Sequence, residues 1–202
     1  MPSRIFLLSP ANASGKRAQM TLNERATFDV AVRLREGGAP IADIFSFISG
    51  LYFRGKVAYA RTFAAPPAGA AGAHVIAAGR GFIPLDTLLT MEDLQQIARV
   101  PIDLDEPRYR EPLERHAREL AQTAGEICEV VLLGSVATPK YIAPLLEVFG
   151  ERLLFPADFV GRGDMSRGGL MLRCVESRRE LVYTPVLGAM RHGKRPPKLG
   201  PK

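Results

Sequence analysis

Hydrophobic positions along this chain form two patterns, short apolar runs and longer stretches with helical spacing. The first four apolar runs lack clean alternation with polar residues, which is typical of strands buried on both faces of a parallel sheet. Two more runs follow near the C-terminal end. The predicted strands are Arg4–Ser9, His74–Ala78, Glu129–Gly134, Arg152–Phe155, Leu170–Val175 and Glu180–Thr184.

Between these runs, apolar residues recur at helical intervals over most of the sequence. Apolar residues from Ile41 to Phe63 recur at helical intervals, with Gly50 and Gly55 as candidate breaks. Start and stop signals predict three more helices. These are a helix capped by Thr90 with Asp93 in the capping-box position, an amphipathic helix over Glu111–Ala124 with Pro112 near its start, and a helix that begins at Thr138-Pro139 and stops at Gly150.

The alternation of strands and helices predicts an α/β protein with three layers, in which helices cover both faces of a mostly parallel sheet. The last two apolar runs are separated by "ESRR", which predicts an antiparallel hairpin at the C-terminal edge of this sheet. We expect a single α/β domain over residues 1–190, with a flexible Ala/Gly/Pro loop at 64–73 inside it. Residues 191–202 are expected to form a basic, disordered tail.

Composition supports a soluble globular protein, with 47% hydrophobic and 24% charged residues in a chain of 202. No apolar stretch reaches the length of a membrane span or a signal peptide. Cys128 and Cys174 lie in apolar runs without neighbours at metal-ligand spacing. We therefore expect a reduced, cytoplasmic protein without a metal or cofactor. The net charge of +6 belongs mostly to the tail, which carries five Lys or Arg and no acid.

Four loops are expected at the ligand-binding edge of the sheet, where the carboxyl ends of parallel strands lie. They are residues 9–17, 79–86, 134–140 and 156–169, and all are rich in glycine, hydroxyl side chains and cations. If they converge, they form a cationic pocket suited to phosphate. The predicted ligand-binding residues are Asn12, Ser14, Gly15, Lys16, Arg80, Gly134, Ser135, Lys140, Arg162, Gly163, Ser166 and Arg167.

The first loop is similar to a phosphate-binding P-loop but lacks two of its defining residues. Gly15-Lys16 fills the Gly-Lys positions, whereas Pro10 stands where the first glycine belongs. Arg17 replaces the hydroxyl residue that holds magnesium. These differences exclude an ordinary P-loop NTPase.

Candidates for acid–base chemistry are few. None of the three histidines lies in a predicted ligand loop, so a Ser-His-Asp arrangement has little support. Asp158 and Asp164 lie in the fourth loop and are the predicted catalytic residues, if the protein is an enzyme. Each could equally shape a turn or pair with a nearby arginine, so the sequence leaves open whether there is a reaction.

Four segments resemble motifs of known proteins. They are "LLSPANASGKR" (7–17), "HVIAAGRGFIPLDT" (74–87), "GSVATPKY" (134–141) and "PADFVGRG" (156–163). In this order they resemble the YaaA-like peroxide-stress family and a related group of uncharacterised bacterial and phage proteins with a uracil-DNA-glycosylase-like α/β domain. A comparable domain occurs in enzymes of archaeosine tRNA modification. The resemblance implies an α/β fold and a ligand that is a nucleotide or nucleic acid.

The leading functional hypothesis is therefore a cytoplasmic domain that binds a nucleotide, nucleoside or nucleic-acid segment in a cationic pocket, with chemistry at a glycosidic bond as one outcome. The alternative is a non-catalytic interaction protein that docks an acidic partner through its Gly/Arg-rich loop and basic tail. A third hypothesis is that the protein is an enzyme that acts on a small carboxylate substrate.

Overall fold

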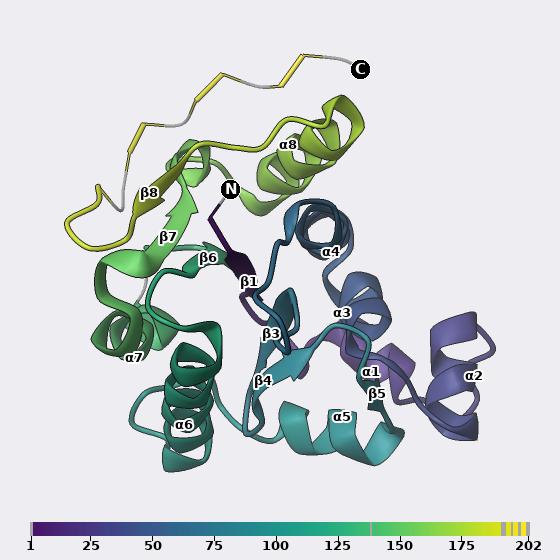
Figure 1. Ribbon diagram of the computed structural model, residues 1–202. Helices are drawn as coiled ribbons and strands as arrows, with labels where there is room; N and C mark the ends of the chain where they lie inside the picture. The colour runs from purple at the N-terminus through teal and green to yellow at the C-terminus, as the bar shows by residue number, and fades with distance from the viewer. Residues whose placement is uncertain (1, 138, 191–192, 195, 198, 201–202) are drawn as a thin grey trace.

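A six-stranded sheet forms the centre of the protein (Figure 1). The computed structural model describes residues 2–137, 139–190, 193–194, 196–197 and 199–200. The strand order is β4-β3-β1-β6-β7-β8. The strands are β1 (Arg4–Leu8), β3 (Ala73–Ala77), β4 (Gly81–Pro84), β6 (Glu129–Leu133), β7 (Leu153–Pro156) and β8 (Tyr183–Pro185). The four inner strands run parallel, whereas β4 and β8 pair antiparallel at the two edges.

The inner strands are mostly apolar because helices cover both faces of the sheet. In β1, the residues from Ile5 to Leu8 are fully buried, and β6 pairs with this strand over its whole length. Figure 1 shows α4 and α8 on one side of the sheet and α6 and α7 on the other. Burial on both faces is the physical reason why these strands do not alternate. The predicted three-layer α/β architecture is confirmed.

The helices differ from the prediction mainly in number and in their starting points. The long stretch 41–63 divides at Gly50, which has φ +63°, whereas Gly55 stays inside a helix. The Thr90–Asp93 capping box is present, and the helix predicted over 111–124 begins one turn earlier. The helices are α1 (Lys16–Thr21), α2 (Asp29–Glu36), α3 (Ile41–Ser49), α4 (Leu51–Phe63), α5 (Met91–Ala98), α6 (Pro107–Ala124), α7 (Pro139–Phe149) and α8 (Asp164–Ser177).

The prediction of a strand over Leu170–Val175 is wrong, because this segment belongs to α8. Gly168, Met171 and Cys174 are buried at helical spacing against the rest of the protein. The antiparallel C-terminal edge is confirmed, but β8 pairs with β7 and not with a strand at 170–175. The strand predicted over 180–184 begins only at Tyr183. Before that point, the N–H of Leu181 donates to the Tyr59 hydroxyl, at 2.8 Å, and not to a neighbouring strand.

Residues 79–86, expected to be a ligand loop, form a tight turn and strand β4, which pairs with β3. A second sheet of two strands, β2 (Ala39–Pro40) and β5 (Leu88–Leu89), lies beside it. Two short 3-10 helices, η1 (Gly150–Arg152) and η2 (Ala157–Phe159), flank β7. The predicted helix cap Thr138 and half of the predicted tail (191, 192, 195, 198, 201 and 202) lie outside the described residues.

Candidate functional site

Ser9 lies at the point where the order of the parallel strands reverses. From β1 the chain proceeds to β3 on one side, whereas β6, on the other side of β1, leads to β7. The loops after β1 and β6 therefore diverge, and in open α/β sheets this crevice is the usual ligand site. The N–H of Ser9 donates to the carbonyl oxygen of Leu133 at 3.2 Å. A Cβ atom on Gly134 would lie only 2.7 Å from the Ser9 Cβ, so a glycine is required here.

Lys56 of α4 reaches this point from the interior. Its side chain is fully buried, and its Nζ donates to Oγ of Ser9 at 2.7 Å and to the Ser9 carbonyl oxygen at 3.0 Å. The ammonium group also lies 4.1 Å from the centre of the Tyr52 ring and 5.1 Å from that of Phe53. Such aromatic faces attract a cation. The side chain is thus held in one orientation by hydrogen bonds and rings.

Helix α8 brings a second set of charges to the same place by crossing closely over α4. A Cβ atom on Gly55 would lie 2.8 Å from the carbonyl oxygen of Gly168, so the two backbones are in contact. The guanidinium of Arg167 donates to the carbonyl oxygen of Phe159 at 3.0 Å and lies 3.4 Å from Asp164. The charges of both Arg167 and Asp164 act on Lys56 and on Tyr52.

Burial changes the protonation of these groups. Desolvation lowers the pKa of Lys56 from 10.5 to about 7, while the charge of Asp164 raises it and that of Arg167 lowers it further. Desolvation raises the pKa of the buried Tyr52 hydroxyl, and the charge of Arg167 and a hydrogen bond from its guanidinium oppose this effect. Burial therefore brings the pKa of Lys56 from the alkaline range down to about 7.

Tyr141 of α7 closes the cluster from the opposite face of the sheet. Its hydroxyl donates to the carbonyl oxygen of Ser135 at 2.7 Å. Burial raises the pKa of this hydroxyl, and hydrogen bonds with Ser9 and Ser135 oppose that effect. We call Ser9, Tyr52, Lys56, Tyr141 and Arg167 the switch-point cluster. It joins residues from β1, α4, α7 and α8 at one position.

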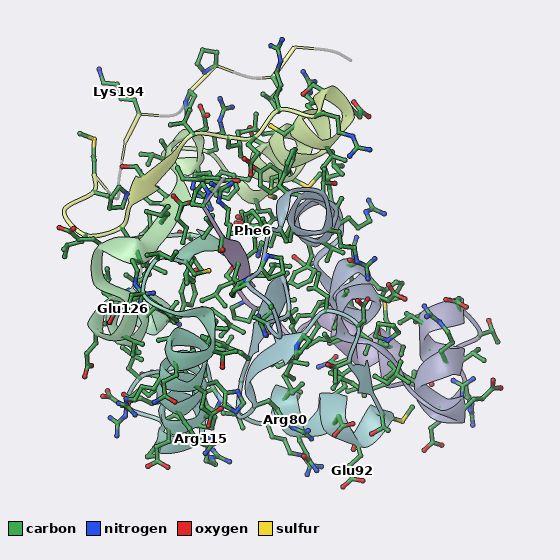
Figure 2. All side chains as sticks on the ribbon, viewed as in Figure 1. Phe6, Arg80, Glu92, Arg115, Glu126 and Lys194 are labelled. Carbon is green, nitrogen blue, oxygen red and sulfur yellow. The ribbon has the colours of Figure 1, made fainter. Side chains whose placement is uncertain are left out.

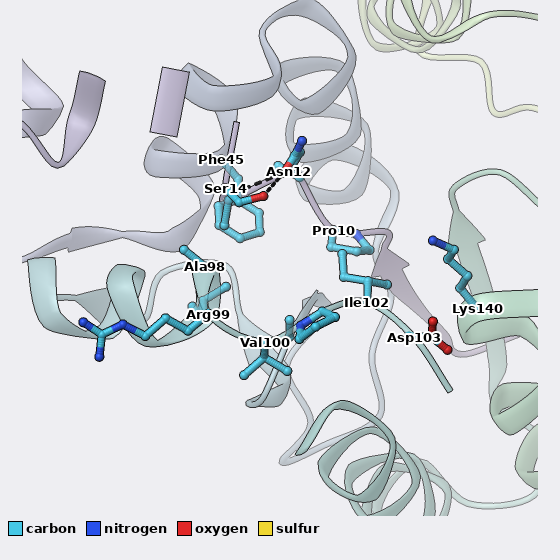
Figure 3. A pocket seen from close by; sticks show the side chains of 15 residues that line it. Pro10, Asn12, Ser14, Phe45, Ala98, Arg99, Val100, Ile102, Asp103 and Lys140 are labelled. Atoms are coloured by element: carbon cyan, nitrogen blue, oxygen red, sulfur yellow. Dashed lines mark hydrogen bonds between the residues drawn. The ribbon is translucent and has the colours of Figure 1, made fainter. Parts of the chain in front are cut away.

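A pocket of 460 Å³ lies at the same edge of the sheet, in front of the loop that follows Ser9. Figure 3 shows the rings and aliphatic side chains of Pro10, Phe45, Val100 and Ile102 around it, with Asp103 and Lys140 together at one end. The Arg99 side chain points away from this end (Figure 3). A volume of this size is in the range of small-molecule sites.

The structure brings several predicted site residues together. Asn12, Ser14 and Lys140 line the pocket, and the Asn12 side chain accepts hydrogen bonds from the N–H and the hydroxyl of Ser14. Gly134 adjoins Ser9, and the charges of Asp164 and Arg167 act on Lys56. Residues from the first, third and fourth predicted loops therefore converge.

Other predicted residues lie elsewhere or already have partners. Arg80 bonds to Asp93 and Gln96 of α5, away from α8 (Figure 2), which removes it from the predicted pocket. Arg162 donates to the Asp158 carbonyl oxygen and to Ser166. The remaining predicted residues are placed as follows: Asp158 is exposed in η2, Lys16 is exposed on α1, Gly15 and Gly163 precede α1 and α8, and the Ser135 Oγ accepts from the Ala137 N–H.

Ser9, Tyr52 and Lys56, which define the cluster, are not among the residues predicted from the sequence to form a site. Ser9 falls in a predicted ligand loop but not among the predicted site residues, and Tyr52 and Lys56 fall in the stretch 41–63 that was predicted as helical. A signal was present: Lys56 occupies a position one helical turn after Tyr52 and one before Ala60, on an otherwise apolar face. A charged residue in the middle of an apolar stripe has to be buried with a partner or a role.

Among the described residues, no group of three or more His, Cys, Asp or Glu side chains is placed to hold a metal ion. Within the same part of the chain, no helix is long and apolar enough to cross a membrane.

Fold and site together define an α/β protein with a parallel sheet and a polar cluster at its switch point. No family model, curated protein or solved structure matches this chain.

Proposed function

We propose that this protein binds a nucleotide, a nucleoside or a terminal nucleotide of a nucleic acid in the pocket beside the switch point. The observation that carries the proposal is the chemistry of the pocket wall, which combines apolar surface with the carboxylate of Asp103 and the cations of Lys140 and Arg99. These are the three kinds of group that a nucleotide requires for its base, its sugar and its phosphate.

Each part of the ligand has a matching part of the wall. Phe45, Val100 and Ile102 offer apolar surface to a base. Asp103 is an acceptor for sugar hydroxyls, a role that acidic residues have in dinucleotide-binding α/β folds. Lys140 lines the same pocket and supplies a cation for a phosphate group.

Binding is the part of this function that the geometry supports, whereas glycosidic chemistry has less support. Asp158 and Asp164 are exposed and do not line the pocket. Asp164 pairs with Arg167, which itself is held by the Phe159 carbonyl. A carboxylate in solvent beside an arginine lacks the apolar surroundings that make a carboxylic acid a proton donor at neutral pH.

The alternative of an acidic docking partner depends on free arginines in the Gly/Arg-rich loop. Arg162 and Arg167 both donate to backbone carbonyl oxygens of their own loop. Docking would therefore depend mainly on the basic segment 191–202, which truncation after Met190 removes.

Binding can be tested by isothermal titration calorimetry with AMP, UMP, the corresponding nucleosides and inorganic phosphate. Wild-type protein should bind a nucleotide more tightly than its nucleoside. Lys140→Ala should weaken nucleotide binding by about 10-fold, the loss of one charge-assisted contact, and should leave nucleoside binding unchanged. Asp103→Asn should weaken both. Arg115→Ala, on the exposed side of α6, is the matched control for a lost cation.

Absence of binding to all these probes would contradict the proposal, as would equal nucleotide affinity in wild type and Lys140→Ala. Truncation after Met190 separates the two hypotheses. Pocket binding should survive the truncation, whereas steeply salt-dependent binding to a nucleic acid that disappears with residues 191–202 would favour docking through the tail.

A further inference from the structure

Ser9 and Lys56 have the geometry of a nucleophile and its base. The Nζ–Oγ distance of 2.7 Å is a direct hydrogen bond between two buried groups. A second hydrogen bond, to the Ser9 carbonyl oxygen, and the Tyr52 ring orient the amine. An activated nucleophile is recognised by a base within hydrogen-bond reach and by a further group that orients this base. All three parts are present here.

A lysine that serves only as a structural cation is expected to have an anionic partner in the interior. Lys56 forms no ion pair with a carboxylate in the described part of the chain. The nearby carboxylate, Asp164, is paired with Arg167. Since burial also lowers the pKa of Lys56 to about 7, a large fraction of the amine is neutral at neutral pH. A neutral amine has a lone pair that can accept the Ser9 proton.

The surroundings of Ser9 favour an incoming substrate. Ser9 directly follows β1 and precedes Pro10, which lines the pocket, so Ser9 lies one residue from the pocket wall. A Cβ atom on Gly134 would lie 2.9 Å from the Ser9 Oγ, so only glycine fits beside this hydroxyl. The Tyr52 hydroxyl is buried, and its oxygen interacts with the Arg167 guanidinium, which leaves the hydroxyl proton without an acceptor among the described residues. A buried donor without a partner is costly, and a substrate oxygen would satisfy it.

We propose that Ser9 is a nucleophile, that Lys56 is its general base, and that the protein cleaves the ester bond of an acyl substrate. This activity goes beyond nucleotide binding and does not require it. Serine–lysine pairs are known substitutes for the Ser-His-Asp arrangement. The Tyr52 hydroxyl is the donor for the oxygen that becomes negatively charged.

The reaction has two balanced steps. Ser9 Oγ attacks the carbonyl carbon of the ester while its proton moves to Lys56 Nζ. The C–O bond to the alcohol breaks, and Lys56 returns the proton to the departing oxygen, which leaves an acyl-Ser9 intermediate. Water then attacks the acyl carbon while Lys56 takes its proton. The bond between this carbon and Ser9 Oγ breaks, Lys56 returns the proton to Oγ, and the products are a carboxylic acid and free Ser9. No oxidant or reductant is involved.

A fluorophosphonate probe tests the nucleophile directly. Ser9 Oγ would attack phosphorus, fluoride would leave, and a stable Ser9–phosphonate bond would add the mass of the probe minus HF. Intact-mass spectrometry and peptide mapping should find one adduct, on Ser9. The labelling rate of wild-type protein should rise as the pH increases through about 7, where Lys56 loses its proton.

Variants separate catalysis from structure. Ser9→Ala should abolish labelling, and Lys56→Met should reduce its rate at least about 100-fold, the usual contribution of a general base. Lys56→Arg keeps a cation but cannot accept a proton, so it should be equally slow. Ser177→Ala, at the exposed end of α8, is the control serine variant and should label like wild type. Circular dichroism checks that each variant is folded.

Three results would overturn the proposal. They are no adduct on Ser9 of wild-type protein between pH 6 and 9, a labelling rate that does not change with pH, and a folded Lys56→Met or Lys56→Arg variant that labels at the wild-type rate. The pH profile is measured on wild-type protein alone, so the proposal stays testable if the Lys56 variants fail to fold. A nucleotide titration in the same samples shows separately whether the binding proposal holds.

Discussion

Gly55 of α4 and Gly168 of α8 are packed backbone against backbone. A Cβ atom on Gly55 would lie 2.8 Å from the Gly168 carbonyl oxygen, and one on Gly168 would lie 2.8 Å from that of Leu51. Side chains at these positions would push the helices apart. The contact matters for the site because α4 carries Tyr52 and Lys56, and α8 carries Arg167.

Alanine at Gly55 or Gly168 should therefore destabilise the protein. In an exposed helix interior, Gly→Ala stabilises by roughly 0.5–1 kcal/mol, but here the added methyl group meets backbone. We expect a net loss of about 1–3 kcal/mol in the free energy of unfolding, measured by urea denaturation. Gly169→Ala is the matched control in the same helix, since a Cβ atom there makes only an ordinary contact at 3.5 Å. Equal effects at Gly168 and Gly169 would refute the close crossing.

The lowered pKa of Lys56 predicts a pH-dependent stability. In the unfolded chain Lys56 holds its proton up to about pH 10.5, whereas in the folded protein it loses the proton near pH 7. Between these values the unfolded state binds more protons, so stability should rise with pH, by up to about 1.4 kcal/mol per pH unit.

Lys56→Met lacks this group and gives the reference. The stability of wild type relative to Lys56→Met should increase from pH 7 to pH 9 in urea denaturation. Parallel stability curves for the two proteins would show that Lys56 is not desolvated in the folded state.

Tyr59 connects the C-terminal segment to the core. Its hydroxyl accepts from the Leu181 N–H at 2.8 Å and lies 2.6 Å from the Tyr183 hydroxyl. Tyr59→Phe leaves the buried Leu181 N–H without this acceptor, and we expect a loss of about 1–3 kcal/mol in thermal or urea unfolding. Tyr183→Phe preserves the bond to Leu181 and should cost less. The reverse order would contradict this arrangement.

His74 predicts a loss of stability in acid. Burial, with a smaller contribution from His116, lowers its pKa from 6.5 to about 4. Between these values the unfolded chain binds a proton that the folded protein does not, so stability should fall as the pH decreases, by up to about 1.4 kcal/mol per pH unit. His74→Gln should reduce this dependence between pH 6.5 and pH 4.5. NMR titration of His74 measures the pKa itself, and a value near 6.5 would contradict the prediction.

The sequence by itself determined the class of fold. The runs at 4–9, 74–78, 129–134 and 152–155 predicted the four parallel strands, because continuous apolar runs have to be buried on both faces. Local signals also worked: Thr90 and Asp93 form the predicted cap, and Gly50 separates two helices. Such features depend on neighbours in the sequence. The prediction of a strand over Leu170–Val175 failed because a short apolar run fits a helix segment as well as a strand.

Only the tertiary structure decided which polar residues meet. Arg80 looked like a ligand-binding residue, but its partners are Asp93 and Gln96 of another helix. Lys56 looked like part of an amphipathic helix, but the packing of α4 against β1 and α8 buries it beside Ser9, 47 positions earlier in the chain. Loss of hydration and the nearby charge of Arg167 lower the pKa of this lysine, while the charge of Asp164 opposes them. These effects come from packing between distant segments, which the local sequence does not encode.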